Sequence, residues 1–124
     1  MKKVIIISIV CCTFMLSCSN SCVIDSEFKL FYFNMLDTIS SYGKQFNTDK
    51  SIILSEERCG RFSDISDYMK LLTNHELRYT IIEQPIYQKL SDLESDIFDL
   101  KNWYEENKCG MTKAKADSIV KSKK

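Results

Sequence analysis

The chain has 124 residues, a length that suits one domain and excludes two. Its 17 basic and 17 acidic side chains balance, so overall charge indicates no particular class of partner. The charge is unevenly distributed, because residues 113–124 hold five lysines and one aspartate and leave an acidic region before them. The sequence contains no clear catalytic or cofactor motif. Its informative features concern cellular location, architecture and interaction surfaces.

The first element is an export signal. Lys2 and Lys3 precede an apolar run over residues 4–16, and Ser17 then stands before Cys18. This run is too short to anchor a chain across a bilayer core, which needs about 20 apolar residues. We therefore interpret residues 1–17 as a cleaved signal peptide, with a retained transmembrane helix as the alternative.

The end of this signal resembles the lipobox of bacterial lipoproteins. Met15, Leu16 and Ser17 stand where that family has aliphatic and small residues before a cysteine that is diacylated and becomes the mature N-terminus. The resemblance covers residues 1–18 alone and implies that Cys18 is the lipidated residue. By the same resemblance Ser19, which is not an aspartate, favours the outer membrane. Two or more acyl chains give stable anchoring, so residues 18–23 form a short lipidated tether outside the cytoplasm.

Residues 24–46 are the first expected helix. Their apolar residues recur at steps of three and four, which indicates one buried face, and Asp25 or Ser26 is the expected N-cap. Leu30 and Phe33 are apolar off that face, so a buried strand is the alternative. The recurring positions are Ile24, Phe28, Phe31, Met35, Ile39, Tyr42 and Phe46.

Two further helices are expected after a connection over residues 47–62. Ser63 or Asp64 caps the second, which carries apolar residues as far as Ile82 with a possible break at Asn74 and His75. Pro85 is placed at the first turn of the third, where proline is tolerated. The third helix then runs to Tyr104, with Gly110 as a stop, and Thr112 caps a short lysine-rich helix.

These elements predict an all-α fold. We expect a small three-helix bundle over residues 24–112, in which the last two helices form an antiparallel hairpin about Gln84. Residues 113–124 are expected to form a short basic tail.

The cysteines predict a disulfide. Cys59 and Cys109 are equally far from Gln84 in sequence, so the hairpin places them at the same open end. Disulfides persist in exported proteins, which favours a bond between these two, with a pairing that involves Cys22 as the alternative. A metal site is not expected, because the single histidine, His75, would lie far from both cysteines.

The third helix also carries a candidate partner surface. Asp92, Asp96 and Asp99 are expected on the side opposite the apolar seam, with Trp103 among them. The alternative is that the first helix or the basic tail covers Trp103. Leu30 and Phe33 are a second candidate surface, suited to docking on another subunit.

The function expected is non-catalytic protein binding at the bacterial envelope, for instance by an immunity or inhibitor protein. An accessory or structural subunit of an envelope assembly is the alternative. We expect a lipid anchor and a protein partner, and neither an enzyme activity, a cofactor, a metal nor a nucleic-acid partner.

Overall fold

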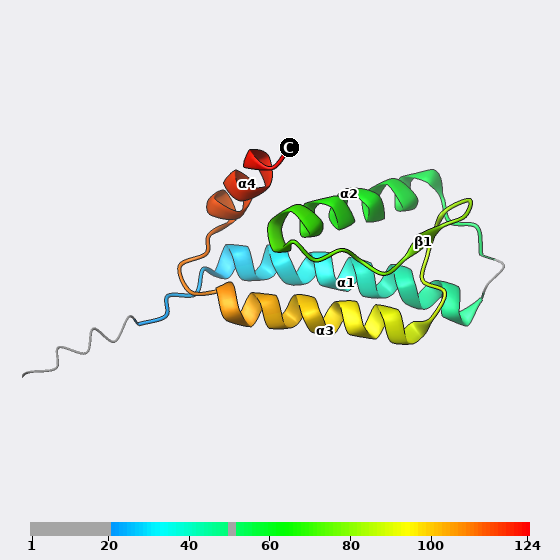
Figure 1. The fold of residues 1–124 in the computed structure, drawn as a ribbon, viewed down its shortest axis with the longest axis horizontal. Helices are drawn as coiled ribbons and strands as arrows, with labels where there is room; N and C mark the ends of the chain where they lie inside the picture. The colour runs from blue at the N-terminus through cyan, green and yellow to red at the C-terminus, as the bar shows by residue number, and fades with distance from the viewer. Residues whose placement is uncertain (1–20, 50–51) are drawn as a thin grey trace, which may run out of the picture.

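The structure is a computed structural model that describes residues 21–49 and 52–124. The chain order there is α1 (Ser26–Thr48), α2 (Glu56–Thr73), β1 (Thr80–Ile81), β2 (Pro85–Ile86), α3 (Leu90–Asn107) and α4 (Lys113–Ser122) (Figure 1). The domain is therefore mostly helical, as predicted. The predicted signal peptide and Cys18, the predicted lipidation site, lie outside the described residues. Within these residues, no helix combines the length and apolar character needed to cross a membrane.

Helix α1 confirms the helical interpretation of residues 24–46. Asp25 is its N-cap, and its carboxylate accepts a hydrogen bond from the Phe28 backbone nitrogen at 2.6 Å. The expected buried face is wider than one stripe, because Tyr32 and Leu36 are buried beside Met35 and Ile39. A broad apolar face allows α1 to pack against several elements at once.

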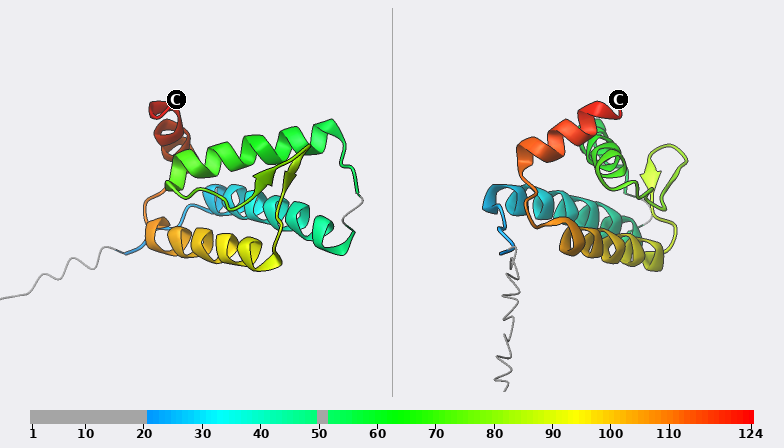
Figure 2. Two further views of the ribbon diagram at one scale, coloured as in Figure 1. Left: turned by 45° about the vertical axis from the view of Figure 1, so that its right-hand side comes forward. Right: turned by 60° about the vertical axis from the view of Figure 1, so that its left-hand side comes forward.

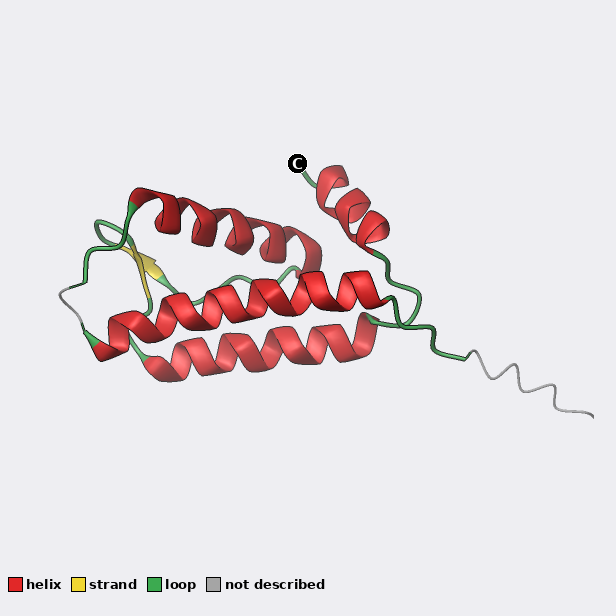
Figure 3. Ribbon diagram, turned by 180° about the vertical axis from the view of Figure 1, so that it is seen from behind, coloured by secondary structure: helices red, strands yellow, loops and turns green. Residues whose placement is uncertain are grey.

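Helices α1 and α3 lie side by side and antiparallel, with α1 between α3 and α2 (Figures 1 and 3). The Tyr32 hydroxyl donates to the Leu100 carbonyl at 2.8 Å, and the Tyr32 ring packs 5.2 Å from that of Tyr104. At the other end of the pair Gly43 allows a close approach, because a Cβ there would lie 2.6 Å from the Leu93 side chain. This pair is the framework on which the other elements lie.

Helix α2 begins earlier and ends earlier than expected. Its N-cap is Ser55, whose hydroxyl accepts from the Arg58 backbone nitrogen, so the predicted caps Ser63 and Asp64 are wrong. Asn74 ends the helix in the left-handed conformation, at φ 59°. The break suspected at Asn74 is therefore the actual end of the helix.

The predicted hairpin of two helices about Gln84 is wrong. Residues 74–89 are not helical, and β1 pairs antiparallel with β2, Thr80 opposite Ile86 and Ile81 opposite Pro85. Two β-branched residues form β1, and β-branched residues favour extended backbone. Pro85 is buried in β2, and α3 starts only at Leu90. Helices α2 and α3 consequently each pack on α1.

The lysine-rich segment 113–124 is part of the fold and not a free tail. Thr112 caps α4, as expected, by accepting from the Lys115 backbone nitrogen at 3.1 Å. Ala116 and Val120 are buried, and α4 packs on α2 (Figure 2). The expected three-helix bundle thus has a fourth helix in the described part of the chain.

Candidate functional site

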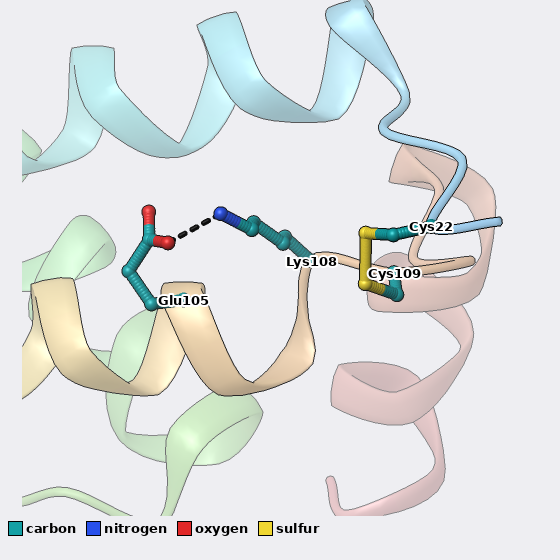
Figure 4. Close-up of a disulfide and its surroundings, with 4 residues drawn as sticks. All are labelled: Cys22, Glu105, Lys108 and Cys109. Atoms are coloured by element: carbon teal, nitrogen blue, oxygen red, sulfur yellow. Dashed lines mark hydrogen bonds and ion pairs between the residues drawn. A yellow bond between two sulfur atoms is a disulfide. The ribbon is translucent and has the colours of Figure 1, made fainter. Parts of the chain in front are cut away.

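A disulfide joins the segment before α1 to the segment after α3, at one end of this antiparallel helix pair. It links Cys22, just before α1, to Cys109, just after α3, with Cα atoms 4.8 Å apart (Figure 4). The Gly110 backbone nitrogen donates to the Val23 carbonyl at 3.1 Å, which aligns the two segments beside the bond. We call this end of the molecule the disulfide end. Lys113, the first residue of α4, lies over the Phe31 ring there.

The predicted bond between Cys59 and Cys109 is therefore wrong, and the alternative with Cys22 is the one found. The prediction depended on a hairpin of α2 and α3 that does not form. Cys59 is free and half-buried, with its Sγ 3.6 Å from the Tyr42 hydroxyl and 3.9 Å from Gln84 Oε1. It lies near the opposite end of α1 from Cys22, out of reach of Cys109.

The most concentrated polar site is built on Asp96 of α3, which is fully buried. Its Oδ2 accepts from the Arg78 backbone nitrogen at 2.7 Å and from the Tyr87 hydroxyl at 2.8 Å. Its Oδ1 accepts from Arg78 Nη1 at 2.7 Å and lies 3.0 Å from His75 Nε2. Both oxygens are thus bonded twice, as a buried carboxylate requires.

Arg78 extends this site to the surface, because its Nη2 donates to Asp99 Oδ2 at 3.0 Å. The hydrogen bond to Asp99 is the largest factor that raises the pKa of Arg78, with the charge of Asp96 adding to it. Burial, followed by the charge of Asp96, raises the pKa of Tyr87 far above its ordinary value. Both groups therefore keep their protons and remain donors to the carboxylates.

His75, Asp96 and Asp99 offer ligand atoms within 4.8 Å of one another, a spacing compatible with a metal ion. The guanidinium of Arg78 already lies between the two carboxylates and bonds to both. A cation would have to displace it. The arrangement instead connects residues 75–87 to α3, which is a structural role.

The expected acidic partner surface is not formed as predicted. Asp96 was placed on the exposed side of α3 but is buried, because it follows Leu93 by three residues and precedes Leu100 by four. Asp99 is half-exposed and held by Arg78, and Asp92 is also half-exposed.

The other candidate partner residues divide between core and surface. Trp103 is half-buried and stacks on Tyr32 at 5.6 Å, so the first helix covers it. Phe33 is half-buried with its ring 5.0 Å from Tyr104, whereas Leu30 is 65% exposed. A role for any of them in partner binding stays a prediction.

Arg78, Tyr87 and the position of His75 in the site were not predicted from the sequence. One signal was present: an aspartate on the same helical face as Leu93 and Leu100 requires buried donors. The donors, His75, Arg78 and Tyr87, lie in the segment before α3. That segment was expected to be helical, and a helix there does not bring these three side chains to Asp96.

The fold and the site define a small, disulfide-linked helical domain whose main polar cluster is internal. No protein-family model, curated protein or solved structure matches the chain.

Proposed function

We propose that this chain is a lipoprotein of the bacterial envelope, anchored through Cys18, most consistently in the outer membrane. It acts as a non-catalytic protein-binding module, of which an immunity or inhibitor protein is one form. The folded domain is then held close to the membrane and captures a partner outside the cytoplasm.

The observation that carries the proposal is the disulfide between Cys22 and Cys109. Structural disulfides persist in oxidising compartments, so the bond supports export independently of the signal segment. Cys22 follows Cys18 by four residues in the sequence, so a lipid on Cys18 would be separated from the disulfide by only three intervening residues. Anchor and fold are thereby connected through a very short tether.

The Asp96 site supports a non-catalytic role. Its histidine, arginine, tyrosine and aspartates are residue types that enzymes use, yet here they bond to one another. The carboxylate at its centre is fully buried and offers substrate no open position. The hydrogen bonds of the Asp96 site stabilise the fold, and we propose that the protein binds its partner through another part of its surface.

The second candidate function is an accessory subunit of an envelope assembly. Leu30, which is 65% exposed on α1, is the candidate docking residue for this function.

Labelling with radioactive palmitate tests the anchor. The full chain should incorporate label and fractionate with membranes, and Cys18→Ala should lose both, whereas Cys59→Ala should keep both. Label that persists in Cys18→Ala would contradict the lipoprotein assignment. Affinity purification from solubilised membranes then separates the two functions: a soluble, stoichiometric partner supports capture, and a large membrane assembly supports the accessory role.

A further inference from the structure

Three isoleucines are exposed at the end of the molecule opposite the disulfide. Ile53 is 86% exposed, Ile81 71% and Ile82 68%. Ile53 lies in the loop before α2, and the other two lie in and just after β1. We call these three residues the isoleucine tip. Large exposed apolar residues that gather in one place commonly mark an interaction site.

Gln84 holds the two segments of the tip together. Its Oε1 accepts from the Leu54 backbone nitrogen at 3.1 Å, and its Nε2 donates to the Ile52 carbonyl at 3.0 Å. One side chain therefore bonds to both neighbours of Ile53. The Gln84 carbonyl also accepts from the Ile82 backbone nitrogen at 3.3 Å, which closes the turn of the strand pair.

The base of the strand pair is fixed to the core. The Tyr42 hydroxyl of α1 donates to the Pro85 carbonyl at 3.1 Å, and both residues are buried. The tip is therefore presented on an ordered support, and binding would cost little additional conformational entropy. A solvent-exposed apolar tip on such a support suits recognition by a partner.

Acidic side chains outnumber basic ones around the tip, where Arg58 is also exposed in the first turn of α2. Glu56, Glu57 and Glu83 are exposed, and none forms an ion pair with another described residue. A hollow of about 210 Å³ opens beside Ile81, and Asp67 in its wall also lacks an ion pair in the described ranges. Lys70 lines the same hollow, but its charge is engaged by Glu76 at 2.7 Å.

We propose that the isoleucine tip is the docking surface for a protein whose apolar hollow is rimmed by lysine or arginine. Its isoleucines would fill the hollow while the acidic side chains face the basic rim, which gives attraction at long range and specificity on contact. This inference rests on the protein-binding function proposed above and names the surface that performs it.

The position of the tip favours this partner over a membrane or a second tip. Helix α1 has 23 residues, so it places the tip about 35 Å from the disulfide end and its anchor (Figures 1 and 3). Two tips facing each other would bring like charges together, which opposes self-association. A basic protein that approaches from outside meets neither obstacle.

The test is photo-crosslinking in the cells that produce the protein. A benzophenone amino acid replaces Ile82 in the full, lipidated chain, and a matched chain carries it in place of Phe98, which is 63% exposed on α3. The expected result is one discrete adduct from position 82 and none from position 98. Mass spectrometry of the adduct should identify a protein with a basic surface.

Charge reversal makes the test specific. Glu57→Lys with Glu83→Lys should lower the yield of the adduct by about tenfold, since attraction becomes repulsion. The control is Glu94→Lys with Glu106→Lys, two exposed α3 positions with the same change in charge. An unchanged far-ultraviolet circular dichroism spectrum confirms that each variant is folded.

Several results would overturn the proposal. These are no adduct from position 82, an adduct that survives charge reversal at the tip, an adduct of twice the chain's mass, or an adduct with lipid. An adduct from position 98 alone would leave the protein-binding function standing and refute the tip. Failure of palmitate labelling would concern only the anchor.

Discussion

Removal of the disulfide should cost a large part of the stability of the domain. The bond joins residues separated by 87 positions. Loop-closure entropy for a chain of that length corresponds to about 4.5 kcal/mol of stabilisation, since the cross-link restricts the unfolded chain. A domain of this size has a total free energy of unfolding of roughly 5–15 kcal/mol. Cys22→Ser with Cys109→Ser should therefore lower the free energy of unfolding by up to that value.

Urea denaturation followed by circular dichroism measures the effect, with Cys18→Ser as the common soluble background. Cys59→Ser is the matched control and should change the free energy of unfolding by less than about 1 kcal/mol, because Cys59 is free. Reduction of the background chain should reproduce the double variant. Equal stability of the oxidised and reduced chains, or a disulfide that disappears in Cys59→Ser, would refute the pairing.

Three further predictions concern single positions. Asp96→Ala should destabilise the domain by about 3 kcal/mol in urea denaturation, because it leaves buried donors without their acceptor; a loss below 1 kcal/mol would contradict the role assigned to the cluster. Gly43→Ala should lower the free energy of unfolding by roughly 1–3 kcal/mol, because the added methyl group overpacks against α3, and the thermal midpoint should fall with it. Gly60→Ala meets open space and should raise the thermal midpoint, because alanine has the higher helix propensity. Changes of the same sign in the two variants would refute this contrast. Hydrogen bonds, first from Lys113 and then from the Tyr68 hydroxyl of α2, hold the pKa of Asp117 below its ordinary value. The stabilisation that Asp117 contributes is therefore present above about pH 4 and is lost as pH falls through the lowered pKa. Asp117→Asn should destabilise the domain at pH 7 and make no difference at about pH 2, as urea titrations at both pH values would show.

Local signals in the sequence predicted α1 and the start of α4 well. Asp25 and Thr112 are side chains that cap helices by direct hydrogen bonds, and such bonds depend on neighbouring residues alone. The buried positions Met35, Ile39 and Tyr42 of α1 follow from its periodicity for the same reason, whereas the extension of the buried face to Tyr32 and Leu36 does not.

Residues 74–89 could not be predicted in this way. Tyr79, Ile82 and Ile86 recur at helical spacing, but the structure leaves Ile82 exposed and buries Leu77 and Tyr87 instead. Tertiary contacts decide the conformation of residues 74–89. Asp96 of α3 accepts hydrogen bonds from Arg78 and Tyr87, and the local sequence of residues 74–89 does not predict these bonds.

One error in the candidate site followed from that segment. The proposed Cys59 to Cys109 bond depended on helices meeting about Gln84. The exposed acidic stripe is a separate error, because the predicted seam already contained Leu93 and Leu100, and Asp96 lies close to both on the helix surface. The structure centres the buried face on Leu93, Asp96 and Leu100, which share the spacing i, i+3, i+7.

The link between Cys22 and Cys109 also determines what proteolysis can do to this molecule. It encloses α1, α2, both strands and α3, so one cut in any loop between the two cysteines leaves both fragments covalently joined. Among the helices and strands of the described residues, only α4 lies beyond the enclosed segment, and its contacts with α2 are non-covalent. A nicked chain would run as one band on a non-reducing gel and as two after reduction. In a compartment exposed to proteases, such a chain keeps its folded parts in one piece.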